Sequence, residues 1–414
     1  MWKCPWGYKE GFVINAGLFT TGILLQLSIG RFSTDFLSFP VNFISGLLFI
    51  FLLTGLHILS RKNRQIRWFS GMEATITSVS SFLILVIVMG LIRQHSGVST
   101  EAGLLNVIGF TQMLSAWSFV LLFVYLEMVL GLVILRRLQH FSWKKDIPFI
   151  LNHLGLFIAL FAGVLGGADM QRLQMIVGKE LPEWRATNDK NEVVELPLAL
   201  ELNQFSIDEY PPKLMIIDSE TGKTLPANQP ASVLIEKSPV KVELLGWTLK
   251  VTKMLESSAP VIATDSVRYV PYFSDGGAAA VFVEANNKKT KETAKGWVSC
   301  GSYVFPYNAL TLNKKTSVVM PDREPKKYAS DVNVYSKNGK SFRSVIEVNK
   351  PLKVDGWKIY QTGYDERRGK WSEVTKLELV KDPWLWLVYT GIIMMMCGAV
   401  CLFVFAKKKS EVRS

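Results

Sequence analysis

The sequence predicts a membrane protein with about six transmembrane helices and a large all-β domain inserted before the last helix. Hydrophobic residues make up 49% of its 414 residues and concentrate in six apolar runs; each is roughly 20 residues long, the length that crosses a bilayer. Charged residues are sparse in the first part of the chain and dense after about residue 170. A membrane part and a water-soluble part are therefore expected in one chain.

The expected spans are residues 11–30, 39–60, 74–93, 114–135, 148–168 and 384–406. The second, fourth and sixth are followed by the basic segments "SRKNRQIR", "RRLQHFSWKK" and "AKKKSEVR". Positive charge marks the cytoplasmic ends of membrane helices, so both termini are expected in the cytoplasm. The net charge of +12 then reflects topology and calls for no nucleic-acid partner.

This topology divides the chain into four parts. Residues 1–147 carry four helices, and the helix at 148–168 leads into a β-rich extracytoplasmic domain at 169–383. The chain closes with one helix and a basic cytoplasmic tail at 384–414.

The β-rich part consists of runs containing many Val, Ile, Tyr and Phe residues, separated by the turn sequences "ETGK", "SDGG", "KNGK" and "VDGW". Such runs predict a β-sandwich or an open barrel-like sheet. The Asn338-Gly339 pair predicts a hairpin turn.

No catalytic residue can be assigned from the sequence. All four histidines precede residue 169, which excludes a Ser-His-Asp triad and a histidine-based metal site from the β-rich part. The four cysteines form no CxxC pair, and no phosphate-binding loop occurs.

The region before the last span carries a recognisable motif. "N-x-P-L" is followed by "G-W-x-I-Y-Q-x-G-Y", and a "DPW" sequence opens the last span. These residues resemble the ResB/CcsB family of cytochrome c biogenesis proteins over about residues 148–406. The matching positions are Asn349, Pro351, Leu352, Gly356, Trp357, Tyr360, Gln361, Tyr364, Asp382 and Pro383. The first four spans match less clearly, and because many family members have fewer spans before the soluble domain, the front of this chain is expected to carry an extra helical hairpin.

The resemblance implies a subunit of the System II cytochrome c synthetase in the bacterial inner membrane. Such a subunit helps to transport haem b and deliver it, with a CcsA-type partner, to CxxCH motifs of apocytochrome c. This chain lacks the tryptophan-rich "WGxxWxWD" segment, so a separate CcsA-like membrane subunit is expected. Thiol-reducing proteins of the pathway and membrane lipid are further expected partners. The chain itself is then either a non-catalytic or a co-catalytic subunit of this haem lyase.

Two histidines are candidates for haem binding. His153 lies near the start of the fifth span, where the residues alone leave haem ligation and helix packing both open. The resemblance implies that His153 is one axial ligand of the haem iron, with the second supplied by the CcsA part. His57, near the cytoplasmic end of the second span, is a weaker candidate that could instead reach toward the interface.

The motif residues have two interpretations: a structural role in turns and packing, which we favour, or a docking surface for CcsA or apocytochrome. For the whole chain, the alternative is a non-haem membrane anchor with an external β-sandwich for binding or sensing. A transporter is disfavoured because charged residues are scarce within the spans.

Overall fold

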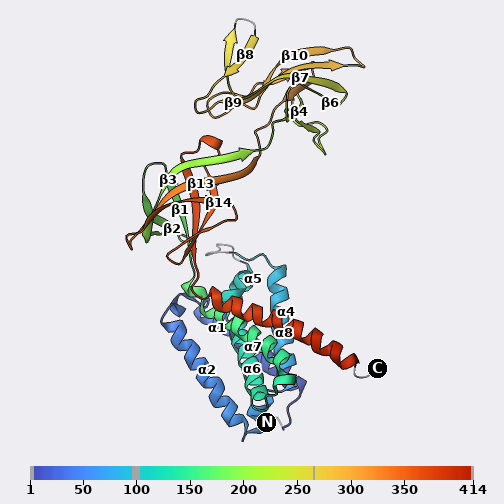
Figure 1. Cartoon of the computed structure of the whole chain (residues 1–414). Coiled ribbons are helices and arrows are strands. Elements are labelled where there is room, and N and C mark those ends of the chain that lie inside the picture. The colour runs from blue at the N-terminus through green and yellow to red at the C-terminus, as the bar shows by residue number, and fades with distance from the viewer. Residues whose placement is uncertain (1–3, 96–102, 264–265, 412–414) are drawn as a thin grey trace. The chain divides into compact units, whose positions relative to one another are not determined.

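The protein folds into two compact units, one helical and one built of strands (Figure 1). The computed structural model describes residues 4–95, 103–263 and 266–411. The helical unit comprises Met1–Gln171 and Lys381–Ser414, and the β unit comprises Arg172–Val380. The β unit is thus inserted in the sequence between the fifth long helix and the last one.

Among the described residues, six helices are long and apolar enough to cross a membrane. This confirms the predicted fold class, six such helices with an all-β region before the last. The long helices are α1 (Tyr8–Ile29), α2 (Val41–Ser60), α4 (Met72–Leu91), α6 (Trp117–Leu138), α7 (Trp143–Leu165) and α8 (Leu385–Glu411). Two short helices, α3 (Arg64–Trp68) and α5 (Leu104–Val107), lie between them.

Helix α7 begins at Trp143, five residues before the start expected from the sequence. The carboxylate of Asp146 explains the difference, because it accepts hydrogen bonds from the backbone N–H of Ser142 and from the Arg137 guanidinium. An acidic residue in the first turn also complements the helix dipole. Pro148 therefore lies inside the helix and does not mark its start.

Helix α6 lies at the centre of the helical unit and contacts α1, α2, α4 and α7. Gly131 permits one of these close approaches. A Cβ atom at this position would lie 2.6 Å from the Leu53 side chain of α2 and 3.3 Å from the ring of Phe157 on α7. Small residues let membrane helices approach closely and gain dispersion energy.

Helices α7 and α8 pack against each other through glycines. A Cβ atom at Gly155 would lie 2.6 Å from the carbonyl oxygen of Gly391, and one at Gly398 would lie 2.5 Å from the Asn152 amide nitrogen. Gly166 packs against the side chain of Trp384. At Gly163 a Cβ atom would meet nothing within 4 Å.

The carboxylate of Asp169 connects three segments beside the α7–α8 pair. It accepts hydrogen bonds of 2.7 Å from the Phe39 backbone N–H, the Asn42 amide and the Trp384 indole N–H. Burial acts to raise the pKa of Asp169, but the three hydrogen bonds prevail and hold the pKa below its usual range.

The first sheet of the β unit has eight strands in the order β14-β13-β3-β2-β1-β17-β16-β15. Edge strand β14 contacts β15 and β16 at the other edge, so the sheet curls on itself around one apolar core. The strands are β1 (Gln171–Gly178), β2 (Glu183–Asn188), β3 (Val193–Glu209), β13 (Pro325–Ser336), β14 (Ser341–Glu347), β15 (Leu352–Val354), β16 (Trp357–Tyr364) and β17 (Val374–Lys381).

The remaining strands form two further sheets that share a second core. One sheet has the order β10-β9-β7-β6 with β8 paired to β7, and the other has the order β11-β12-β4-β5. They comprise β4 (Lys213–Asp218), β5 (Ser232–Leu234), β6 (Val240–Leu244), β7 (Trp247–Ala263), β8 (Ser266–Pro271), β9 (Ala278–Asn287), β10 (Thr293–Ser299), β11 (Leu310–Thr311) and β12 (Thr316–Val319). The β unit therefore combines a curled sheet with a sandwich-like pair, whereas the sequence suggested one or the other.

Several motif residues form turns or core contacts. Asn349 has φ +63° between β14 and β15, and Asp355 and Gly356 (φ +47° and +83°) form the tight turn between β15 and β16. Trp357 is buried in the first core, on which Leu352 and Tyr364 also pack. Asp382 accepts a hydrogen bond of 3.1 Å from the Trp384 N–H just before α8. The turns and packing support the structural interpretation of these residues.

Gln361 belongs to a buried polar network in the first core. Its side-chain oxygen accepts a hydrogen bond of 2.6 Å from Ser330, and its amide nitrogen donates to Thr375 at 2.8 Å and to the Gly363 carbonyl at 2.9 Å. Ser330 and Thr375 are fully buried. A buried network of this kind favours one register of the strands as long as every polar group in it has a hydrogen-bond partner.

Replacing Asp169 by Asn should destabilise the helical unit, because the new amide group would face hydrogen-bond donors. We expect the free energy of unfolding to fall by about 1–3 kcal/mol at neutral pH. The lowered pKa adds a pH dependence: the carboxylate stabilises the fold above its usual pKa of about 4, and this is lost as pH falls through the folded-state value. Thermal unfolding of the purified protein from pH 3 to 7 measures both effects. Exposed Asp189→Asn is the control, and equal losses in the two variants would contradict the prediction.

Replacing Gln361 by Ala should remove the hydrogen bonds that it makes with Ser330 and Thr375, which would keep only the bond between themselves. We expect this to destabilise the β unit by about 1–3 kcal/mol. The matched control is Gln174→Ala, which removes an exposed side chain of the same type on β1. Chemical denaturation followed by far-ultraviolet circular dichroism compares the two. A loss no greater than that of the control would show that the network contributes little.

Candidate functional site

His153 lies in the third turn of α7 and is half-buried. Its Nδ1 lies 2.9 Å from the carbonyl oxygen of Phe149, and a carbonyl can only accept, so Nδ1 carries the proton. The Phe149 ring stacks on the imidazole, with centroids 3.8 Å apart and planes inclined by 19°. These contacts orient the ring and select the neutral tautomer in which Nε2 has the free lone pair.

The position of His153 on α7 differs from that of the residues facing α8. Asn152, Gly155 and Ala159 contact α8, whereas Phe157 contacts Gly131 of α6. His153 precedes Phe157 by one turn, so it shares the face of α7 that includes the α6 contact. The imidazole is therefore not part of the glycine-lined α7–α8 interface.

His57 is buried and engaged with a neighbouring side chain. Its Nε2 donates to the side-chain oxygen of Gln139 at 2.7 Å, in the amide orientation that also lets this oxygen accept from Arg61 at 2.9 Å. Ligation of iron through Nε2 would first require this hydrogen bond to break. Of the other two histidines, His140 is exposed, and His95 donates its backbone N–H to Thr111 at 2.9 Å.

Glu127 was not identified from the sequence. It lies midway along α6 and is 2% exposed, and neither carboxylate oxygen has a hydrogen-bond partner within the described part of the chain. Tyr125 and Asn15 also bury an oxygen without a described partner. The available signal was one acidic residue within the apolar run "FVLLFVYLEMVLGLVI". Buried ionisable residues within membrane spans commonly mark function.

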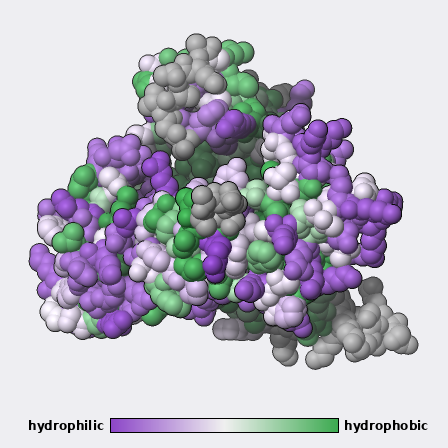
Figure 2. Space-filling model, turned by 90° about the horizontal axis from the view of Figure 1, so that it is seen from above, coloured by the Kyte–Doolittle hydropathy of each residue, from purple (hydrophilic) through white to green (hydrophobic). Residues whose placement is uncertain are grey.

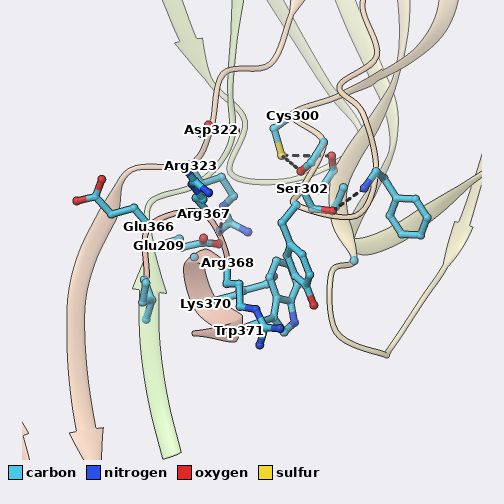
Figure 3. A pocket seen from close by; sticks show the side chains of 18 of the residues that line it. Glu209, Cys300, Ser302, Asp322, Arg323, Glu366, Arg367, Arg368, Lys370 and Trp371 are labelled. Carbon is cyan, nitrogen blue, oxygen red and sulfur yellow. Dashed lines mark hydrogen bonds and ion pairs between the residues drawn. The ribbon is translucent and has the colours of Figure 1, made fainter. Parts of the chain in front are cut away.

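A cavity of about 870 Å³ lies within the β unit (Figure 3). One wall is the segment 300–307 between β10 and β11, here called the aromatic loop. The opposite wall is the segment 364–371 after β16, here called the basic loop. The cavity volume falls in the range of about 300–1,000 Å³ that is typical of small-molecule sites.

The aromatic loop is fixed by its own hydrogen bonds. The Ser302 hydroxyl donates to the Gly276 carbonyl and accepts from the N–H groups of Val304 and Phe305 at 3.2 and 3.1 Å. The Ser302 N–H donates to the Phe305 carbonyl at 2.8 Å. Gly301 has φ +75°, and a Cβ atom there would lie 2.6 Å from the Tyr307 nitrogen. These contacts leave the loop few alternative conformations.

The basic loop is also anchored. Tyr364 packs on the rings of Phe205 and Tyr328, with centroids 5.0 and 5.3 Å away. Aromatic contacts join the loops: Trp371 lies 5.9 Å from Tyr303, and the Arg368 guanidinium lies 5.7 Å from the same Tyr303 ring. Both walls thus present aromatic rings, and the basic loop places its cations beside them.

The cavity is lined by charged side chains of both signs: the cations are Arg323, Arg367, Arg368 and Lys370, and the carboxylates are Glu209, Asp322 and Glu366. Arg323 is paired with Glu209 and Glu256 at 3.5 and 2.7 Å, and Arg368 is paired with Glu373. Arg367 and Lys370 form no ion pair with any described carboxylate, although Lys370 lies 4.5 Å from the Trp371 ring. In Figure 3 the Glu366 carboxylate points away from the labelled cations.

Cys300 lines the cavity but is poorly suited to thiol chemistry. Burial raises the pKa of its thiol, which disfavours the reactive thiolate. Its sulfur lies 3.4 Å from the Gly301 carbonyl oxygen and 3.8 Å from that of Ala279. These contacts indicate a packing residue at the base of the aromatic loop.

The face of the molecule seen in Figure 2 has a mixed surface. Figure 2 shows one face on which hydrophilic residues cover much of the coloured surface, with hydrophobic residues in small groups among them. The cavity is a candidate binding site of the β unit.

Comparison with known families identifies the region that contains this cavity. Residues 278–372 match the ResB-like family, and every cavity-lining residue lies within them except Ile207, Glu209 and Gly277. No curated protein matches the chain. The match supports a role in cytochrome c biogenesis. The similarity of residues 278–372 to the ResB-like family is consistent with a ResB/CcsB cytochrome c biogenesis protein.

Proposed function

We propose that the protein is the ResB/CcsB-like subunit of a System II cytochrome c synthetase. It receives haem b in the membrane through His153 and, together with a CcsA-like tryptophan-rich subunit, delivers it to the CxxCH motif of apocytochrome c. The protein lies in the bacterial inner membrane, with both termini in the cytoplasm and the β unit on the outer side. The membrane-length helices and the ResB-like match support this proposal.

The geometry of His153 is the observation that carries the proposal. Histidines that ligate metal commonly donate their second ring N–H to a backbone carbonyl, which fixes the tautomer. The Nδ1 of His153 makes this bond to Phe149 and leaves Nε2 for an iron. The residues present therefore fit an axial ligand of the transported haem.

The second ligand is assigned to the CcsA-like partner. His57 is less suitable because its Nε2 already donates to Gln139. Haem supplies the vinyl groups that react with the cysteines of apocytochrome c, and no residue of this chain is assigned to thioether formation. The role of this subunit is then to hold and orient the haem.

The test of His153 uses the complex with its CcsA-like partner. His153→Ala should lower the haem content of the purified complex about tenfold or more, because one axial ligand is lost. Added imidazole should restore the original absorption spectrum by replacing the missing side chain. His140→Ala is the control because His140 is exposed at the end of α6, and His57→Ala should also retain haem. A complex whose haem amount and spectrum survive His153→Ala would refute the assigned role.

The orientation has a separate test. Alkaline phosphatase, which folds only outside the cytoplasm, should be active when inserted in the turn between β9 and β10 at residues 288–291. The same enzyme fused after residue 414 should be inactive. The reverse pattern would exclude the proposed topology, whatever the role of His153.

A further inference from the structure

We infer that the cavity of the β unit is a second site for the transported tetrapyrrole, which it holds through aromatic and basic side chains without an axial ligand. Identifying the ligand as a porphyrin rests on the proposed function. The chemical class of the ligand, a flat molecule bearing carboxylates, is argued from the cavity itself.

The aromatic residues indicate a ligand with a broad apolar face. Tyr303 and Tyr307 are 43% and 69% exposed, so they contribute little to a core. The internal hydrogen bonds of their loop order the backbone that carries them before any ligand arrives. Exposed rings on a rigid loop can stack on a planar ligand at a small cost in conformational entropy.

The unpaired cations indicate that the ligand is anionic. Arg367 and Lys370 lie on the same wall, and no described carboxylate pairs with either of them. Guanidinium groups bind carboxylates through paired, charge-assisted hydrogen bonds, and an ammonium provides a second positive charge. The two propionates of a porphyrin match this pair of cations.

The backbone of the aromatic loop argues against an extended peptide as the occupant. Peptides that add to a sheet edge need free N–H and carbonyl groups. In the aromatic loop the N–H groups of Ser302, Val304 and Phe305 are already used within the loop. Recognition must therefore depend mainly on side chains, as expected for a small planar ligand.

The cavity differs from the His153 site because it offers no histidine as a ligand for iron. All four histidines lie before residue 169, so none lines the cavity. The raised pKa of the Cys300 thiol also makes it a poor ligand for iron. Binding at the cavity should therefore be as strong for metal-free porphyrin as for haem, whereas His153 can act only on the iron-containing form.

The test measures binding of metal-free protoporphyrin IX to the full chain in lipid nanodiscs by fluorescence anisotropy. Arg367→Gln combined with Lys370→Gln should raise the dissociation constant about tenfold or more, because two charge-assisted contacts are lost. Lys337→Gln with Lys340→Gln removes the same charge from the β13–β14 turn and is the control. For protoporphyrin dimethyl ester, the cavity variant and the wild type should bind alike, because no carboxylate remains.

The two proposals can fail separately. His153→Ala should leave binding of metal-free protoporphyrin unchanged, because no iron is present to ligate. If the cavity variant binds protoporphyrin as tightly as the control does, the cavity site is wrong even when His153 proves to ligate haem. Equal unfolding temperatures of the wild type, the cavity variant and the lysine control variant establish that a weaker affinity does not result from misfolding. Weaker binding of the dimethyl ester to the cavity variant would also contradict the proposed site. It would show that the two substitutions disturb stacking and not contacts with the propionates.

Discussion

The pairing of α7 with α8 is the contact on which the arrangement of the chain depends. More than two hundred residues separate the two helices in sequence, and the β unit lies between them. Gly155 and Gly391 allow their backbones to meet, and Asp169 joins the end of α7 to Trp384. The chain therefore leaves the helical unit and returns to it at adjacent points. Both connections to the β unit are thus fixed by one helix pair.

The same pairing determines what each face of α7 can do. One face carries glycines such as Gly155 and is occupied by α8, so it has little room for a ligand. His153 lies on another face, where the Phe149 carbonyl determines its tautomer. Helix packing and the candidate ligand thus use different residues of a single helix. Packing of α7 against α8 is therefore compatible with a candidate haem ligand on the same helix.

Local sequence signals predicted much of the fold. Six apolar runs gave the six long helices, and the Asn338-Gly339 turn joins β13 to β14, with Gly339 at φ +78°. Among the motif residues, Trp357 and Gln361 are buried, and Asn349 and Gly356 lie in turns. Other features depend on contacts distant in sequence. The aromatic and basic loops are some sixty residues apart, so composition alone could not predict their common cavity. Glu127 was not predicted as a site residue because one acidic residue barely changes the mean hydropathy of its span.

The hydrogen bonds that fix the aromatic loop also bear on exchange kinetics. A binding wall that is ordered in advance requires no loop closure before a ligand enters and no reopening before it leaves. The association rate of the ligand is then limited by diffusional encounter, and its dissociation rate by the strength of the contacts alone. A protein that passes its cargo onward needs short residence times more than high affinity. For the proposed porphyrin site, the Ser302-centred contacts thus favour rapid transfer of a ligand over its storage.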